Sequence, residues 1–203
     1  MALGIVISLV VIWLAAVYFF YKNRIWLFYY LVGAVGLSFI IIFIGRMLSL
    51  EMFLEVTVAN TVHQICNWVG IPTKLFQASP GSLLIMVIGQ EVGWTVVQIT
   101  IECSGLLEIA AMMGMVLMFP GWTLRKRALL AVIGAVTIFL ANCARLFMII
   151  IVLHNMGKDS LFISHTIIGR ALFFLIVVFI YWYIITRPML KDVRNKLHKD
   201  LAK

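Results

Sequence analysis

Charged side chains are scarce in this sequence. Only 12% of its 203 residues are Asp, Glu, Lys or Arg, whereas 64% are hydrophobic. A water-soluble domain normally carries about a quarter charged residues, so the composition excludes an ordinary soluble globular protein. The hydrophobic residues form runs of about 20 residues, the length that crosses a hydrocarbon layer about 30 Å thick. The sequence therefore predicts a polytopic membrane protein.

Other features are also missing. No basic residue precedes the first hydrophobic run and no small-residue cleavage site follows it, so we expect a retained helix and not a removed signal peptide. The net charge of +8 has no soluble domain on which to form a basic face, which excludes nucleic acid as a partner. His63, His154 and His198 have no partner at ligand spacing, so we expect no metal site and no cofactor, and His154 is interpreted as an interfacial loop residue.

Five hydrophobic runs are long enough to cross a membrane. They predict an all-α polytopic fold with one integral membrane domain over residues 1–186, followed by a basic tail over 187–203. No internal repeat and no second soluble domain is visible. The spans are expected at about 3–21, 25–45, 102–119, 128–153 and 166–186.

The basic residues predict the orientation of these spans, because basic loops stay cytoplasmic. Only Arg46, Lys74 and Lys158 fall on the opposite side. We therefore expect a multi-pass plasma-membrane protein with its N-terminus outside and its tail in the cytoplasm. Eleven of the 16 Lys and Arg residues lie in three places: the 22–24 turn, the 125–127 turn and the tail after 186.

The outer segment 46–101 is less hydrophobic than the spans. Met47–Gly70 is interpreted as an amphipathic helix at the outer interface, and a sixth, polar span stays open. Leu83–Ile88 and Trp94–Ile101 are rich in β-branched residues and predict a small outer-face β-hairpin. Six polar residues, among them His63, interrupt this helix, and five of them recur at helical spacing and are expected to form a solvated stripe: Glu51, Glu55, Asn60, Gln64 and Asn67.

Three charged residues fall inside the predicted spans: Glu108, Arg145 and Arg170. A charge at mid-membrane costs at least about 2.5 kcal/mol, so each is a functional candidate. Arg145 is placed about 12 Å short of the outer end of its rising span. Since two descending spans begin at the outer face near the other candidates, the topology brings the whole set to the outer half of the membrane. The remaining polar candidates are Cys103, Ser104, Asn142 and His165.

The predicted helix starts would tune two of these groups. Cys103 is expected in the first turn of its helix, capped by Thr100, where the helix dipole favours the thiolate. Ser164 is a natural N-cap for the last span, and the same dipole favours a neutral imidazole at His165.

Two further relations follow from spacing. Asn142 lies three residues before Arg145 and is expected to steady its guanidinium group. Glu108 and Arg170 each lie five residues after the first functional residue of their spans, about 7.5 Å deep. We hypothesise that Glu108 and Arg170 form an ion pair that clamps these two helices together.

The other two cysteines are expected to be small packing residues. Cys143 lies two residues from Arg145 and therefore points to the opposite face of the helix. A disulfide between Cys66 and Cys103 is the one geometrically conceivable pairing and stays an alternative.

Taken together, these residues resemble the exosortase/archaeosortase family over about residues 102–169. The resemblance implies that Cys103, Arg145 and His165 act as the catalytic set, with Asn142 in support. It also implies substrates that are exported proteins with a C-terminal sorting signal, made of a short motif, a transmembrane helix and a basic cluster. Many members have more spans, so this chain would be a compact member. The resemblance rests on three motifs: Cys103-Ser104-Gly105, Asn142-x-x-Arg145, and His165 followed by Gly169.

The expected function is therefore that of a membrane cysteine protease or transpeptidase working through a thioacyl intermediate at the outer face. Water, an amine or a lipid headgroup stays open as the acceptor. We further hypothesise that the strand Trp94–Ile101, which leads into Cys103, binds an extended substrate at its free edge. A non-enzymatic membrane scaffold is one alternative and a small transporter is another. The uniformly apolar inner halves of the spans argue against a transport path.

Overall fold

The structure is a computed structural model. It describes residues 2–79, 82–88, 94–99, 104–156, 169–192 and 194. The helices are α1 (Ala2–Lys22), α2 (Trp26–Met47), α3 (Leu50–Val69), α5 (Leu106–Met118), α6 (Leu124–Met156), α7 (Phe173–Tyr181) and the π-helical η3 (Trp182–Thr186). The strands are β1 (Thr73–Ser79), β2 (Ser82–Ile88) and β3 (Trp94–Ile99).

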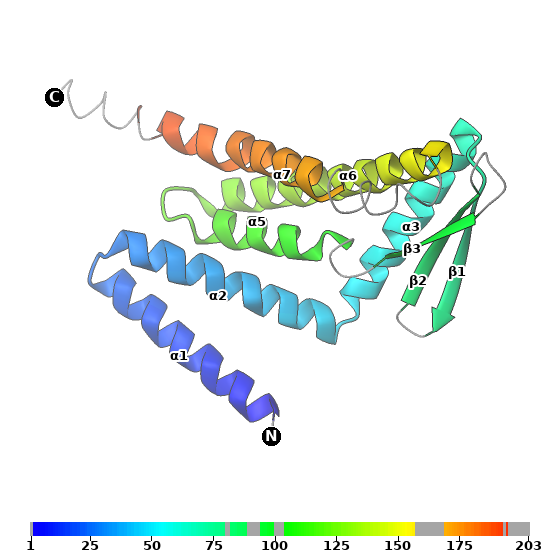
Figure 1. The fold of residues 1–203 in the computed structure, drawn as a ribbon. Helices are drawn as coiled ribbons and strands as arrows, with labels where there is room; N and C mark the ends of the chain where they lie inside the picture. The colour runs from blue at the N-terminus through cyan, green and yellow to red at the C-terminus, as the bar shows by residue number, and fades with distance from the viewer. Residues whose placement is uncertain are drawn as a thin grey trace.

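The long helices form an elongated bundle, in which α6 lies between α5 and α7 (Figure 1). Buried side chains of these three helices make one continuous hydrophobic core, which includes Met112, Ile138 and Val177. On the other side of α5, small residues let α2 approach closely. A Cβ atom added at Gly114 would lie 2.5 Å from the backbone oxygen of Ala34. Close packing through small residues is the usual way in which membrane helices associate.

A second core lies at the other end of α6. Here α3 runs steeply across the bundle, with the sheet on its far side (Figure 1). The contributing residues come from α3 (Val58, Ala59, Val62, Cys66), the sheet (Ile85, Val87, Val97) and the last half of α6 (Leu146, Ile149, Ile150, Leu153). Because α6 contributes to both cores, it joins the bundle to the end of the molecule that carries α3 and the sheet.

Three of the described helical segments are long and apolar enough to cross a membrane: Trp26–Met47, Leu124–Met156 and Gly169–Asp192. Val6–Lys22 and α5 are apolar but shorter, and α3 is not among the helices that are both long and apolar enough to cross a membrane. The membrane class and the mainly helical fold are therefore confirmed. The count of five or six spans stays a prediction. The interfacial interpretation of α3 fits its composition and its direction across the bundle.

Three helices differ in extent from the predicted spans. α5 begins at Leu106, directly after Gly105, which has a left-handed φ of +76°; Glu102 and Cys103, where this span is expected to begin, lie outside the described residues. The helix expected over 128–153 runs through Met156, so His154 lies in its last turn and not in a loop. The last helix continues past 186 to Asp192, so helix extends into the predicted tail.

The predicted hairpin is confirmed, but it is part of a larger sheet. β1 pairs with β2 and β2 pairs with β3, both antiparallel, in the order β1-β2-β3. The strand β1 was not expected from sequence. It follows α3 directly. The hydroxyl oxygen of its first residue, Thr73, is hydrogen-bonded to Nδ1 of His63 in α3, with 2.7 Å between the two atoms.

The solvated stripe predicted for α3 is only partly correct. Asn60, Gln64 and Asn67 are exposed, but the Glu55 side chain is buried, with 5% of the residue exposed. Burial raises the pKa of Glu55, and the neighbouring charge of Glu51 raises it further. Glu51 itself forms a surface ion pair with Arg46 of α2, with 3.3 Å between the Nε and Oε2 atoms.

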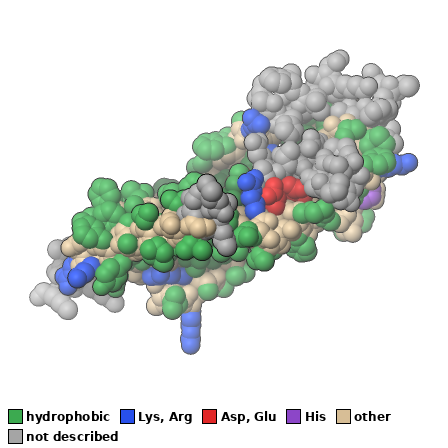
Figure 2. All heavy atoms as spheres, turned by 90° about the horizontal axis from the view of Figure 1, so that it is seen from below, with side chains coloured by type: hydrophobic (Ala, Val, Ile, Leu, Met, Phe, Trp, Pro, Cys, Tyr) green, Lys and Arg blue, Asp and Glu red, His purple; other side chains and the backbone are tan. Residues whose placement is uncertain are grey.

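The turn between α1 and α2, the start of α6 and the described end of the last helix lie together at one end of the bundle, away from the sheet (Figure 1). These are the three basic places that the sequence predicts on one side. At this end Asp192 accepts hydrogen bonds from Lys126 Nζ at 2.5 Å and from Trp122 Nε1 at 2.9 Å. The ion pair fixes the end of the last helix to the α5–α6 turn. Hydrophobic side chains cover much of the bundle surface seen in Figure 2, as a surrounding lipid phase requires.

Candidate functional site

Five of the seven predicted site residues lie in the described part of the chain, and all five come from three neighbouring helices or their first turns. Cys103 and His165 lie outside the described residues. Cys103 directly precedes Ser104 in the sequence, and His165 precedes Gly169 by four residues. The surroundings of Ser104 and Gly169 therefore define the region to which the two remaining residues are covalently joined.

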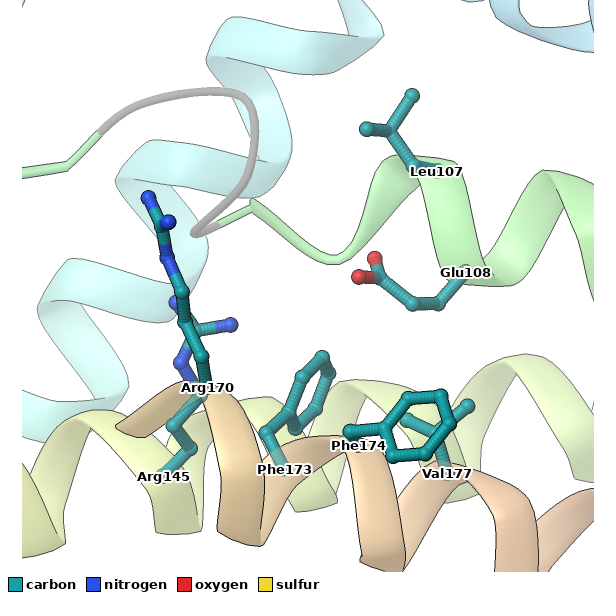
Figure 3. A pocket seen from close by; sticks show the side chains of 7 residues that line it. All are labelled: Leu107, Glu108, Arg145, Arg170, Phe173, Phe174 and Val177. Atoms are coloured by element: carbon teal, nitrogen blue, oxygen red, sulfur yellow. The ribbon is translucent and has the colours of Figure 1, made fainter. Parts of the chain in front are cut away.

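A cavity of about 470 Å³ lies between α5 and the last helix, with α6 behind it (Figure 3). Three of the predicted site residues line it: Glu108 from α5, Arg145 from α6 and Arg170 from the π-helical turn that precedes α7. The other described residues of its wall are hydrophobic. The cavity therefore holds two guanidinium groups and one carboxyl group against an apolar wall made by Leu107, Phe173, Phe174 and Val177.

Arg145 is the most enclosed of the three charged groups, with only 5% of the residue exposed. Its guanidinium carbon lies 4.8 Å from the centre of the Phe173 ring, which is a cation–π contact. This contact joins α6 to α7 and fixes the guanidinium at the cavity. In Figure 3 the Glu108 carboxyl group points from α5 into the space that Arg145 and Arg170 also line.

The predicted clamp between Glu108 and Arg170 stays a prediction. The structure brings both side chains to one cavity, as their equal depth led us to expect. It also brings Arg145 there, so the carboxyl group shares its surroundings with two arginines and not one.

The Ser104–Gly105 turn packs directly against Asn142. Both Ser104 and Asn142 are fully buried, at 0% exposed. The Ser104 hydroxyl oxygen accepts a 3.2 Å hydrogen bond from the Leu106 backbone N–H at the start of α5. A Cβ atom added at Gly105 would lie 3.5 Å from Asn142 Nδ2. Asn142 thus contacts the turn that follows Cys103, while Arg145, one helical turn later, lines the cavity.

Two residues with a structural role at this site were missed from sequence. Phe173 carries the cation–π contact with Arg145. Tyr181 lies on α7, and its hydroxyl donates a 2.9 Å hydrogen bond to the backbone oxygen of Glu108. No sequence signal distinguishes either from the other aromatic residues of a membrane helix.

The cysteines away from the site behave as predicted. Cys66 and Cys143 are free and buried, and both belong to the hydrophobic core that α3, the sheet and the last half of α6 form. The alternative disulfide at Cys66 is therefore not formed. Burial raises the pKa of the Cys66 thiol to about 11, which keeps it protonated and unreactive at neutral pH.

The comparisons with known proteins give one match. The family model described as transmembrane exosortase matches residues 2–183. No curated protein and no solved structure matches the chain. The matched range includes all the described helices that contribute to the cavity.

Proposed function

Because the chain belongs to the transmembrane exosortase family, we propose that it is a membrane cysteine peptidase or transpeptidase. In this proposal it cleaves the C-terminal sorting signal of exported proteins at the outer face of the plasma membrane. The single observation that carries the proposal is the cavity in which Arg145, Arg170 and Glu108 meet beside the turn that follows Cys103. Three charged groups brought together within membrane helices are costly and are seldom retained without a function.

The proposed reaction uses the three residues carried over from the family. The Cys103 thiolate attacks the scissile carbonyl carbon, the C–N bond breaks, and a thioacyl intermediate forms on the sulfur. His165 gives a proton to the leaving amine and then takes one from the acceptor, which is water, an amine or a lipid headgroup. Arg145 stabilises the negative charge that develops on the carbonyl oxygen. Its enclosure supports this role, because a charge acts more strongly where water is excluded.

The length of α6 supports an outer-face location for the chemistry. The helix has 33 residues and is about 50 Å long, whereas the hydrocarbon layer is about 30 Å thick. The basic residues Arg125–Arg127 lie at the start of α6. About 20 residues are needed to cross the hydrocarbon layer, so a crossing that starts after Arg127 ends near Phe147. Arg145 would then lie at the outer boundary. The exposure of α6 near this point fits the count, since the apolar side chain of Met148 is exposed, whereas Ile149, Ile150 and Leu153 after it are buried.

The packed core between α5, α6 and α7 supports an enzyme over a transporter. Inward of the cavity these helices are joined by buried apolar side chains, including Met112, Val116 and Ile180. A transporter needs a polar path that opens to each side in turn. A scaffold function remains the alternative, and the experiment below separates it from the enzyme.

The test is a Cys103→Ser variant co-expressed with a reporter protein that ends in a sorting motif, a transmembrane helix and a basic cluster. We expect the wild-type protein to cleave the reporter and the variant to leave it intact. Cys66→Ala and Cys143→Ala are matched controls, because both thiols pack in the core between α3, the sheet and α6. Both variants should retain cleavage. A thioester between the reporter and Cys103, released by hydroxylamine, would identify the intermediate. Normal cleavage by Cys103→Ser would refute the enzyme proposal.

A further inference from the structure

The strand β3 lies at an edge of the sheet. It pairs with β2 along its whole length, from Trp94 opposite Ile88 to Ile99 opposite Leu83. On its other side, no strand of the described residues pairs with it. Backbone N–H and C=O groups that face an open edge can accept another extended chain. One face of the sheet is fixed on α3 and α6 through buried side chains such as Ile85 and Val97.

This edge leads directly to the proposed nucleophile. The last residue of β3, Ile99, precedes Cys103 by four residues, which is at most about 14 Å of extended chain. Ser104, the next residue after Cys103, is buried beside Asn142 at the site. The Trp94 end of the strand is therefore the end remote from the site, and the Ile99 end is the near one.

The opposite edge of the sheet has no such connection. β1 begins at Thr73, directly after α3, and its first side chain is hydrogen-bonded to His63 of that helix. Its last residue, Ser79, lies three positions before Ser82, the first residue of β2. Only β3 offers an edge that is continuous with the site.

We propose that the open edge of β3 binds the substrate segment that precedes the scissile bond, as an added strand parallel to β3. This inference rests on the proposed function. Such a segment must end at Cys103, because its last residue supplies the carbonyl carbon that the thiolate attacks. Its exported domain lies upstream of that point and its transmembrane helix downstream. The segment therefore runs toward Cys103, in the same direction as β3.

An antiparallel strand would not meet this condition. Its C-terminal end would lie beside Trp94, and the scissile bond would be displaced by the length of β3, which is about 20 Å for six residues. In the parallel arrangement, backbone hydrogen bonds supply affinity whatever the side chains, and alternate side chains of the substrate face the same side. This explains how one site could hold different proteins that share only a short motif.

The test is disulfide cross-linking in a Cys103→Ala background, where the substrate is not turned over. Val96→Cys and Gln98→Cys place a thiol at alternate positions of β3. Lys74→Cys and Phe76→Cys are the matched controls on β1, since the register sets Lys74 and Val96 opposite the same residue of β2, and Phe76 and Gln98 opposite another. The partner is the reporter protein with single cysteines at successive positions upstream of the cleavage site, which is mapped with the wild-type protein.

Two results are expected. Both β3 thiols cross-link to the reporter while both β1 thiols do not, and the reporter position that joins Gln98→Cys lies two residues nearer the cleavage site than the one that joins Val96→Cys. The reverse order would overturn the parallel arrangement, and equal cross-linking to β1, or none to β3, would overturn docking at this edge. Membrane insertion of Val96→Cys and Gln98→Cys and their elution as a single species in detergent, as for the wild-type protein, show that these variants fold. A wild-type protein that leaves the reporter intact would instead refute the proposed function.

Discussion

The left-handed turn at Gly105 offers a sharp test of the site. The φ angle of this residue is +76°, and an added Cβ would meet only Asn142, at 3.5–3.6 Å, which is an ordinary van der Waals distance. Gly105→Ala therefore introduces no steric clash with a neighbour. Its cost lies in the backbone, because a left-handed conformation is about 1–2 kcal/mol less favourable for a residue with a side chain. We expect the free energy of unfolding to fall by that amount.

Gly70 is a matched control for this substitution. Its φ is +83°, nothing lies within 4 Å of an added Cβ, and it ends α3 away from the cavity. Gly70→Ala should lose about the same 1–2 kcal/mol. Since a folded domain has about 5–15 kcal/mol of stability, both variants stay folded. Any difference in their activities then reports on the site and not on the amount of folded protein.

Activity should fall only in Gly105→Ala. If the alanine relaxes toward negative φ, the turn rotates and moves Ser104, and with it Cys103, relative to Asn142 and Arg145. Gly105→Asn should lose less stability than Gly105→Ala, because asparagine tolerates the left-handed region better. Thermal unfolding in detergent measures the stability, and the initial rate of reporter cleavage measures the activity. Equal cleavage rates for Gly105→Ala and Gly70→Ala, or wild-type stability of Gly105→Ala, would refute this reasoning.

Three further predictions concern packing, positioning and reactivity. Gly114→Ala should cost about 1–3 kcal/mol of unfolding free energy, because the added Cβ would lie 2.5 Å from a backbone oxygen of α2 and the helices must separate; thermal unfolding at wild-type temperature would contradict it. Tyr181→Phe should lower stability by about 0.6 kcal/mol through loss of its interhelical hydrogen bond, whereas Tyr183→Phe, an exposed residue of the same helix, should change nothing measurable in the same melting experiment. N-ethylmaleimide at pH 7 should label Cys103 and leave Cys66 unmodified, because burial and a pKa of about 11 suppress the Cys66 thiolate. Mass spectrometry of the modified peptides measures the labelling. Labelling of Cys66 in the folded protein would show that this thiol is not buried.

The membrane-crossing helices were largely predictable from sequence, because their position depends on local hydrophobicity. The left-handed backbone at Gly105, directly before α5, was not predictable, since a single φ angle leaves no mark on hydrophobic periodicity. The strand β1 was missed because its sequence mixes apolar and polar residues, and its pairing with β2 is what makes it a strand. Glu55 was expected in solvent, because helical spacing alone does not tell which face of α3 the sheet and α6 cover.

At the site, the charged residues were predictable and their surroundings were not. Glu108, Arg145 and Arg170 are conspicuous because charge is rare in such helices, and all three line one cavity. The contacts of Arg145 with Phe173 and of Tyr181 with the backbone of α5 join helices far apart in the sequence. Such pairings are decided by tertiary packing, and hydrophobic periodicity carries no information about them.

The continuity of α6 between the two hydrophobic cores has a consequence for substrate choice. Because α6 is one continuous helix, the height of the cavity above the bilayer midplane would not vary with the conformation of a linker. On the proposed function, a substrate anchored by its own helix presents its scissile bond at a height set by the spacer between bond and anchor. The enzyme would then select substrates by the length of this spacer, because each residue added to or removed from an extended spacer would displace the scissile bond by about 3.3 Å. A bilayer of different thickness would shift the same measurement, so that lipid composition itself becomes part of the specificity.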